Sequence, residues 1–321
     1  MKKSPNKLES MGLTVNKRST LKTLMSQWQL MLMSIPVLLY VLVFNYGPLF
    51  GWSYAFYDYN NGLGAKAKHP WIGWESFEFL FGRKGKDFIR SLRNTLGMSV
   101  INLVLGTVSA ILLAILLNEV RNRKFKRTVQ TVTYLPHFLS MVIVVSMAQN
   151  IFASDGPINQ VLLGLGLAKE PIPFLSDGRY FWGMTGVINV WKEVGWNTII
   201  YISAMTSIDP SLYEAAAIDG AGRFQRILHV TLPGIKSTFV ILLIMNIGHL
   251  LEAGFEIQYL LGYGVVQDWS ETIDVFSFRY AFKNDMYSVA TASSMFKSVV
   301  GIILLVGANL IAKKLDEDTL L

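Results

Sequence analysis

One apolar segment of the chain carries a regular series of side chains that can form hydrogen bonds and ion pairs. Between residues 181 and 207, these positions follow one another at offsets of three, four, seven and eight residues, which places them on one face of a helix. The series consists of Asn189, Lys192, Glu193, Trp196 and Asn197. A lysine at the centre of a membrane helix costs about 2.5–3.5 kcal/mol. We therefore expect this face to avoid lipid.

The same side chains have a chemistry that suits a polar, hydroxylated ligand. Lys192 and Glu193 are adjacent, so they point about 100° apart and are expected to find partners on other helices and not in each other. An indole such as Trp196, beside amides and carboxylates, can stack on a sugar ring while the polar groups bond its hydroxyls. The alternative is that this face holds helices or subunits together.

Two further apolar segments contain polar faces at similar depth. Residues 236–257 contribute Asn246, His249 and Glu252, with Glu256 nearer the outer surface. Residues 129–151 contribute Tyr134, His137 and Ser140 around Pro136. If the three faces converge on one axis, they form a binding cavity, and we take Tyr134, Asn246, His249 and Glu252 as candidates together with the series above. We expect Lys297 to extend outward to the membrane surface.

Other kinds of site chemistry find little support. The chain has no cysteine, which excludes disulfides and thiolate metal ligands. His249 and Glu252 give H-x-x-E without the second histidine of a zinc hydrolase, and no G-x-x-x-x-G-K-[ST] nucleotide motif occurs. We expect no catalytic residue, no metal ligand and no cofactor bound by this chain.

Repeated apolar runs position these residues in a membrane. The chain has 321 residues, is 52% hydrophobic and has a mean hydropathy of +0.38. Runs of about 20 apolar residues match the length that a helix needs to cross a bilayer. We predict an all-α polytopic protein with a transmembrane domain at 29–313 and six spans near 29–50, 93–118, 129–151, 181–207, 236–257 and 291–313.

Basic residues predict the orientation. They cluster in the N-terminal tail at 1–28, in the short loop at 121–127 and after the last span, so these parts and the tail at 314–321 are expected in the cytoplasm. The loop at 51–92 is also basic, but long loops count less. Membrane topology explains the net charge of +7 better than nucleic-acid binding does. Residues 19–28 have the spacing of a helix at the membrane surface, although a continuation of the first span fits equally well.

The loop at 208–235 has more local order than a simple connection requires. Asp209 and Pro210 form a cap followed by proline at the first helical position, and the alanines at 215–217 extend that helix. Gly220 allows a left-handed turn that ends it, and Pro233 stops a second helix. A small alanine-faced helix suits docking into a groove of another protein. The alternative is a structural re-entry turn.

This loop resembles the EAA loop of ABC importer permeases, E-A-A-x-x-D-G-A followed at a distance by I-x-x-P. The matching residues are Glu214, Ala215, Ala216, Asp219, Gly220, Ala221 and Pro233. Val230 replaces the usual isoleucine, and Ser237 stands where a further proline is common. The resemblance implies the type-1 ABC importer fold, with these residues coupling the spans to an ATPase. Further motifs, such as Trp191–Trp196, resemble permeases for complex oligosaccharides.

The resemblance also implies a set of partners. It predicts a second homologous permease, forming a heterodimer, two ATPase subunits that dock on 209–233 and use ATP and Mg, and an extracytoplasmic solute-binding protein. The expected function is import of a sugar, an oligosaccharide, across the bacterial cell membrane by alternating access, with both termini cytoplasmic. A permease for another solute, a polytopic membrane enzyme and a channel are the alternatives; a channel leaves the loop at 208–235 unexplained.

Overall fold

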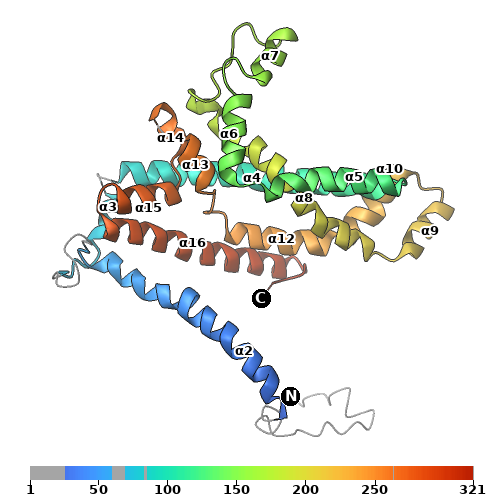
Figure 1. Ribbon diagram of the computed structural model, residues 1–321. Coiled ribbons are helices and arrows are strands. Elements are labelled where there is room, and N and C mark those ends of the chain that lie inside the picture. The colour runs from blue at the N-terminus through green and yellow to red at the C-terminus, as the bar shows by residue number, and fades with distance from the viewer. Residues whose placement is uncertain (1–25, 60–68, 83–84, 263, 321) are drawn as a thin grey trace. The chain divides into compact units, whose positions relative to one another are not determined.

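The chain is almost entirely helical. A computed structural model describes residues 26–59, 69–82, 85–262 and 264–320 (Figure 1). Within these ranges, the β contact is limited to one isolated bridge between Tyr57 and Trp71. The chain divides into two compact units, residues 1–53 and 54–321. Most of the surface helix expected at 19–28 lies outside the described residues.

The first unit contains the predicted first span. Helix α2 (Trp28–Val41) continues through the π-helix η2 (Leu42–Tyr46) into the 3₁₀ helix η3 (Gly47–Phe56). Together they form a stretch of 29 residues that contains an 18-residue window with a mean hydropathy of 1.9. This length is sufficient to cross a bilayer.

Three long helices dominate the second unit, and they coincide with predicted spans two, four and six. They are α4 (Lys86–Glu119), α8 (Phe181–Thr206) and α16 (Tyr287–Lys314). Helices α4 and α16 are apolar enough to cross a membrane, because they contain 18-residue windows with mean hydropathies of 2.6 and 2.0, respectively. Helix α8 is long enough to span, but the polar series that begins at Asn189 lowers its hydropathy.

Two other membrane-length segments are broken by prolines. Helix α5 (Arg123–Tyr134) and the 3₁₀ helix η5 (Leu135–Phe138) meet α6 (Met141–Ile151) at 103°. Pro136 has no amide hydrogen to continue the helical ladder, and the hydroxyl of Ser140 caps α6 by accepting from Ile143.

The second break separates the loop at 208–235 from the predicted fifth span. There, residues Arg223–Gly234 meet α12 (Lys236–Gly248) at 56°, with Pro233 beside the break. Counting each bent pair as one span gives up to five candidate spans in the described residues, so the count of six stays a prediction.

Short helices connect the long ones. On the predicted outer side these are α3 (Glu75–Phe81), α7 (Pro157–Gly164), η6 (Gly178–Tyr180), α13 (Glu256–Leu261), η8 (Gly264–Val266), α14 (Gln267–Ser270) and α15 (Ile273–Phe282). On the predicted cytoplasmic side they are α9 (Pro210–Ile218), α10 (Arg223–Arg226), η7 (Ile227–Thr231) and α11 (Leu232–Gly234).

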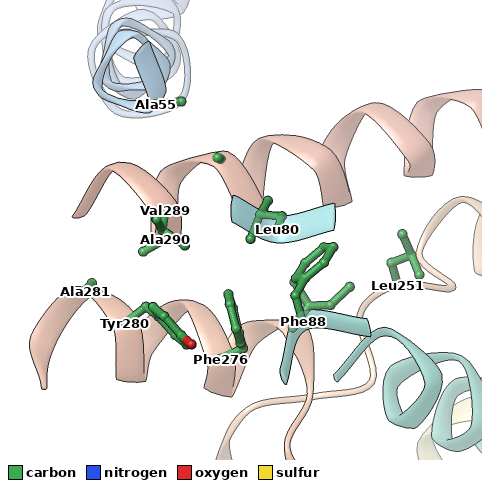
Figure 2. Packing of buried hydrophobic residues seen from close by; sticks show 11 residues of the cluster. Ala55, Leu80, Phe88, Leu251, Phe276, Tyr280, Ala281, Val289 and Ala290 are labelled. Atoms are coloured by element: carbon green, nitrogen blue, oxygen red, sulfur yellow. The ribbon is translucent and has the colours of Figure 1, made fainter. Parts of the chain in front are cut away.

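An aromatic cluster fixes one end of the second unit, on the predicted outer side. Phe88 of α4 and Phe276 of α15 are fully buried and pack edge to face, with ring centroids 5.5 Å apart (Figure 2). Phe276 also stacks on Tyr280 at 4.2 Å. Leu80 of α3 and the small residues of α16 complete this cluster. Burying rings of this size stabilises the junction of the four helices α3, α4, α15 and α16.

Small and polar residues bring α4 and α8 close together. A Cβ added at Gly186 would lie 2.7 Å from Cγ2 of Ile101, so a larger residue there requires the isoleucine side chain to shift. Thr198 of α8 is fully buried, and its hydroxyl donates to the carbonyl of Ala110 on α4 at 3.2 Å. Such contacts are the usual means of packing helices in lipid, where apolar surface gives no net attraction.

The expectation for Lys297 was wrong. Its ammonium does not extend outward, because it donates to the carboxylate of Asp274 on α15 at 2.5 Å and is 19% exposed. The ion pair joins α15 to α16, which are packed together. The lysine therefore fastens two helices instead of anchoring one to the membrane surface.

Candidate functional site

The polar series of α8 does not present one face to one cavity. Its side chains face three different elements: α4, η5 and α12. Asn189 donates to the side-chain oxygen of Asn102 on α4 at 3.2 Å. Lys192, Glu193 and Trp196 contact η5, and Asn197 lines a cavity bounded by α4 and α12. Residues that share a helical face in sequence thus take different roles in the fold.

Lys192, Glu193 and His137 form a closed network. The ammonium of Lys192 donates to the carbonyl of His137 at 2.8 Å and to Glu193 at 3.1 Å. Nδ1 of His137 lies 2.7 Å from the other oxygen of Glu193. An ionised carboxylate can only accept, so this contact selects the tautomer with hydrogen on Nδ1.

This network both confirms and corrects the expectation from sequence. Each residue has a partner on another helix, as predicted, because η5 supplies His137 to both. The two side chains also pair with each other, which the 100° separation on the helix argued against. The long lysine side chain bends toward the histidine carbonyl, and the carboxylate of Glu193 reaches the same point.

Trp196 packs on the same histidine. Its indole lies parallel to the imidazole of His137, with ring centroids 4.4 Å apart and planes 5° apart. The residue is nevertheless 44% exposed, so part of the indole stays free. Tyr134 ends α5, is half-buried and does not line the cavity described next.

A polar cavity of about 200 Å³ lies between α4, α8 and α12. It brings together four of the candidate residues, Asn197, Asn246, His249 and Glu252. His249 is held at the end of α12, where its Nδ1 lies 2.8 Å from the carbonyl of Met245. The α12 helix ends at Gly248, so His249 and Glu252 stand on non-helical backbone beside the cavity. Such backbone is tolerated at membrane depth where it lines a cavity.

Helix α4 supplies polar residues that the sequence analysis missed. Ser99, Asn102 and Thr107 line the cavity from the side opposite α12. Their spacing on one face of an otherwise apolar helix is the signal that could have revealed them. Ser99 is buried, and its hydroxyl has no hydrogen-bond partner among the described residues. A buried hydroxyl without a partner indicates a place for water or a ligand.

The loop at 208–235 contains a short exposed helix. Asp209 caps α9 by accepting from the backbone of Ser211 at 2.9 Å, and this hydrogen bond lowers the pKa of its carboxyl. Gly220 ends the turn with φ +79°, a conformation that favours glycine. The hydroxyls of Tyr213 and Thr231 lie 3.0 Å apart and join α9 to η7.

The residues that match the loop motif lie on the surface. No residue of α9 is buried, and Ile218 at its end is 86% exposed. A depression of about 330 Å³ runs beside α9 and exposes the small side chains of the loop. It is lined by Ala216, Asp219, Gly220, Ala221, Gln225, His229 and Val230. Exposed apolar and small residues around a concave surface are typical of a protein contact.

Fold and sites together define a class of membrane transport protein. Residues 91–317 match the family described as "Binding-protein-dependent transport system inner membrane component". This range covers most of the chain, and the chain therefore belongs to this family. The match confirms the resemblance to importer permeases and establishes the chain as a membrane protein.

Two relatives from Bacillus subtilis are similar to this chain over nearly its whole length. The polygalacturonan/rhamnogalacturonan transport system permease protein YteP of Bacillus subtilis (strain 168) is 43% identical over 296 residues, which cover 92% of this chain and 91% of the relative. Protein LplB of the same organism is 42% identical over 322 residues, and all of both chains is covered.

A solved structure supports the fold. A chain in the crystal structure of a bacterial ABC transporter involved in the import of the acidic polysaccharide alginate is 35% identical and has a TM-score of 0.82. The match covers 92% of this chain and 98% of that chain. A second structure shows the alginate transporter in complex with an alginate pentasaccharide-bound periplasmic protein. The all-helical permease fold predicted from sequence is confirmed.

Proposed function

We propose that this chain is the permease subunit of an ATP-driven importer and carries an oligosaccharide across the cell membrane by alternating access. The observation that carries the proposal is similarity over nearly the whole chain to a permease for polygalacturonan and rhamnogalacturonan. The polar cavity between α4, α8 and α12 supports it, because a sugar needs many hydrogen-bonding groups at membrane depth.

The cavity is the proposed site of sugar passage. Asn197 and Asn246 offer amide donors and acceptors, and Glu252 offers a carboxylate that accepts from hydroxyls. His249 adds a ring nitrogen, and Trp196, which precedes Asn197 on α8, offers a partly exposed indole next to this lining. Ser99, Asn102 and Thr107 complete the donor set from α4. Lys192 and Glu193 hold α8 to η5 beside this site.

The loop at 209–233 is the proposed contact with the ATPase. Closure of two ATPase subunits on ATP and Mg would move α9, and the bond between Tyr213 and Thr231 would pass that movement toward α12. A second permease subunit would complete the cavity, and a solute-binding protein would deliver the sugar from outside. The resemblance to importer permeases supports this set of partners, and docking of the ATPase on 209–233 would put that loop and both termini on the cytoplasmic side.

A pair of glycine variants tests this function in the complete importer. Gly220→Val should abolish ATP-driven oligosaccharide uptake and reduce co-purification of the ATPase, because valine is strained at φ +79°. Gly222→Val is the matched control two residues away, where φ is −68° and a side chain meets only ordinary contacts. The measurements are uptake of a labelled oligosaccharide into proteoliposomes and the ATPase recovered with the purified permease.

Two results would contradict the proposal. A wild-type importer that accumulates no oligosaccharide with ATP and its binding protein would remove the sugar function. Equal uptake and equal ATPase recovery for the two glycine variants would remove the coupling role of the loop.

A further inference from the structure

A second cavity lies away from the proposed site of passage. It has a volume of about 420 Å³ and is bounded by α13, α14 and α15, between the predicted fifth and sixth spans and on the predicted outer side. Six polar or charged residues give it its character: Gln258, Tyr259, Gln267, Glu271, Arg279 and Lys283. These residues belong neither to the loop at 208–235 nor to the polar cavity between α4, α8 and α12, which we call the inner cavity.

The wall of the cavity is rigid. Glu271 is fully buried and receives two bonds from the guanidinium of Arg279, Nε to Oε1 at 2.6 Å and Nη2 to Oε2 at 3.0 Å. Asn94 of α4, also fully buried, donates to the carbonyl of Glu271 at 3.1 Å. Burial raises the pKa of the Glu271 carboxyl, against the opposing effect of Arg279. A paired two-point contact of this kind fixes the guanidinium in place.

Two arginines pair with the three carboxylates around the cavity. Arg279 also donates to Asp87 at 3.2 Å, and Arg90 lies 3.0 Å from Asp87 and 2.8 Å from Asp268. Each of the three acids therefore has an arginine partner. The remaining cation that lines the cavity takes no part in these ion pairs.

That cation is Lys283. It forms no ion pair within the described residues, and its ammonium lies over the ring of Tyr259, 5.7 Å from the centroid. The residue is exposed, so this cation–π contact is worth only about 0.5–1 kcal/mol. A ligand carboxylate can attract the ammonium away from the ring at small energetic cost.

The remaining groups suit a sugar. The amide of Gln267 forms no side-chain hydrogen bond within the described residues, and Gln258 uses its Nε2 on the carbonyl of Ala253 at 2.9 Å, which leaves its oxygen available. Tyr259 is held by Phe255 and Phe278, each with its centroid 5.1 Å away. Amide groups and an aromatic wall next to a free cation match the hydroxyls, the apolar ring face and the carboxylate of a uronic acid.

We propose that this outer cavity binds an acidic sugar unit of the oligosaccharide, with Lys283 on its carboxylate, before the chain passes to the inner cavity. The inference rests on the proposed sugar-importing function and adds the substrate class, an oligosaccharide that contains uronic acids. Alginate and polygalacturonan, which the relatives transport, are polymers of this class.

The experiment compares an acidic probe with its uncharged form. Trigalacturonate and its methyl ester have the same sugar backbone and differ in the charge of the carboxyl groups and in the added methyl groups. Their uptake is measured in proteoliposomes that contain the complete importer and its binding protein. Lys283→Gln should raise KM for the acid about 5-fold, the factor expected for one exposed ion pair, and leave the ester unchanged. Lys169→Gln, at an exposed lysine of another loop on the predicted outer side, is the matched control and should change neither.

A second variant tests the sign of the charge. Gln267→Glu places a carboxylate in the wall of the cavity and should raise KM for the acid while leaving the ester unchanged. Because every variant works with the same binding protein, the selectivity of that protein cancels in the ratio of variant to wild type. Assembly is checked by ATPase recovery, so a folding defect is recognised separately.

Three outcomes would overturn the inference. Equal effects on acid and ester would indicate packing instead of charge recognition. An effect that appears in liposomes containing phosphatidylglycerol but disappears in phosphatidylcholine alone would assign the site to a lipid headgroup. If the importer takes up the ester but not the acid, it transports sugars but does not accept an acidic substrate. If it takes up neither probe and no neutral oligosaccharide, the proposed function itself is contradicted.

Discussion

Two sides of α8 treat polar residues in opposite ways. On the side that faces η5, Lys192, Glu193 and His137 satisfy one another within 3.1 Å. On the side that faces α12, Asn197 lines a cavity together with Asn246 and Glu252, and the hydroxyl of Ser99 in the same cavity has no partner in the described part of the chain.

This difference distinguishes polar residues that hold helices together from polar residues that can contact a transported ligand. Polar groups at membrane depth are expensive, and the protein accepts that cost in two ways. It either pairs them with one another, which fixes helix positions, or leaves them around a space that a hydrated ligand can fill. Both arrangements look alike as a stripe of polar residues in an apolar segment, and only contacts distinguish them.

The largest expected effect comes from breaking the paired side. Glu193→Ala leaves the ammonium of Lys192, whose side chain is 9% exposed, with only the carbonyl of His137. We expect the unfolding free energy to fall by about 1–2 kcal/mol, the upper range measured for polar contacts between membrane helices. Thermal unfolding of the purified importer measures this loss.

A paired variant controls for the loss of side-chain volume. Replacing both Lys192 and Glu193 by methionine removes the charges together and should recover part of the stability, because no unpaired charge remains. If Glu193→Ala unfolded at the wild-type temperature, the network would not have the structural role assigned to it.

The next effect compares one residue type on both sides of the same helix. Asn197→Ala should raise KM for oligosaccharide uptake about 5-fold through loss of one ligand hydrogen bond, with unchanged thermal stability. Asn189→Ala loses its bond to Asn102 and should lower stability by about 0.6 kcal/mol with unchanged KM. The opposite pattern, a KM change in Asn189→Ala alone, would reverse the assignment of the two sides.

The smallest effect concerns the hydroxyl without a partner. Ser99→Ala removes a buried oxygen that makes no hydrogen bond in the described structure, so stability should stay the same or rise slightly. If that oxygen bonds the passing sugar, KM should rise about 2-fold, a fraction of one hydrogen bond. Unfolding and uptake assays on the same preparation give both values, and a clear loss of stability would show that Ser99 has a structural partner.

Much of the architecture could be predicted from sequence. Long apolar runs predicted helices at α4 and α16, and Pro136 and Pro233 mark the breaks because proline removes a backbone donor. The capped helix at Asp209 and its end at Gly220 followed from local chemistry alone. These features depend on neighbours within a few residues, which a sequence displays directly.

The division of the polar series could not be predicted in this way. Helical spacing shows that Asn189 and Asn197 share a face, but it does not show which neighbouring helix each one meets. The contribution of α4 to the cavity was missed because Ser99, Asn102 and Thr107 are uncharged and small. Lys297 was misplaced because its partner, Asp274, is 23 residues away in sequence and approaches only when α15 packs on α16.

The approach of α5 to α8 makes Gly195 a fixed pivot of the helix pair. A side chain there would lie 2.1 Å from the carbonyl oxygen of Thr133, so any substitution must push the two backbones apart. Because His137 follows only four residues after Thr133, that separation would also pull the histidine away from Lys192 and Glu193. In a library of variants at position 195 that is selected for a stable importer, we therefore expect only glycine to be retained. The absence of a side chain at this one position determines both the spacing of the two helices and the ion pairing beside them.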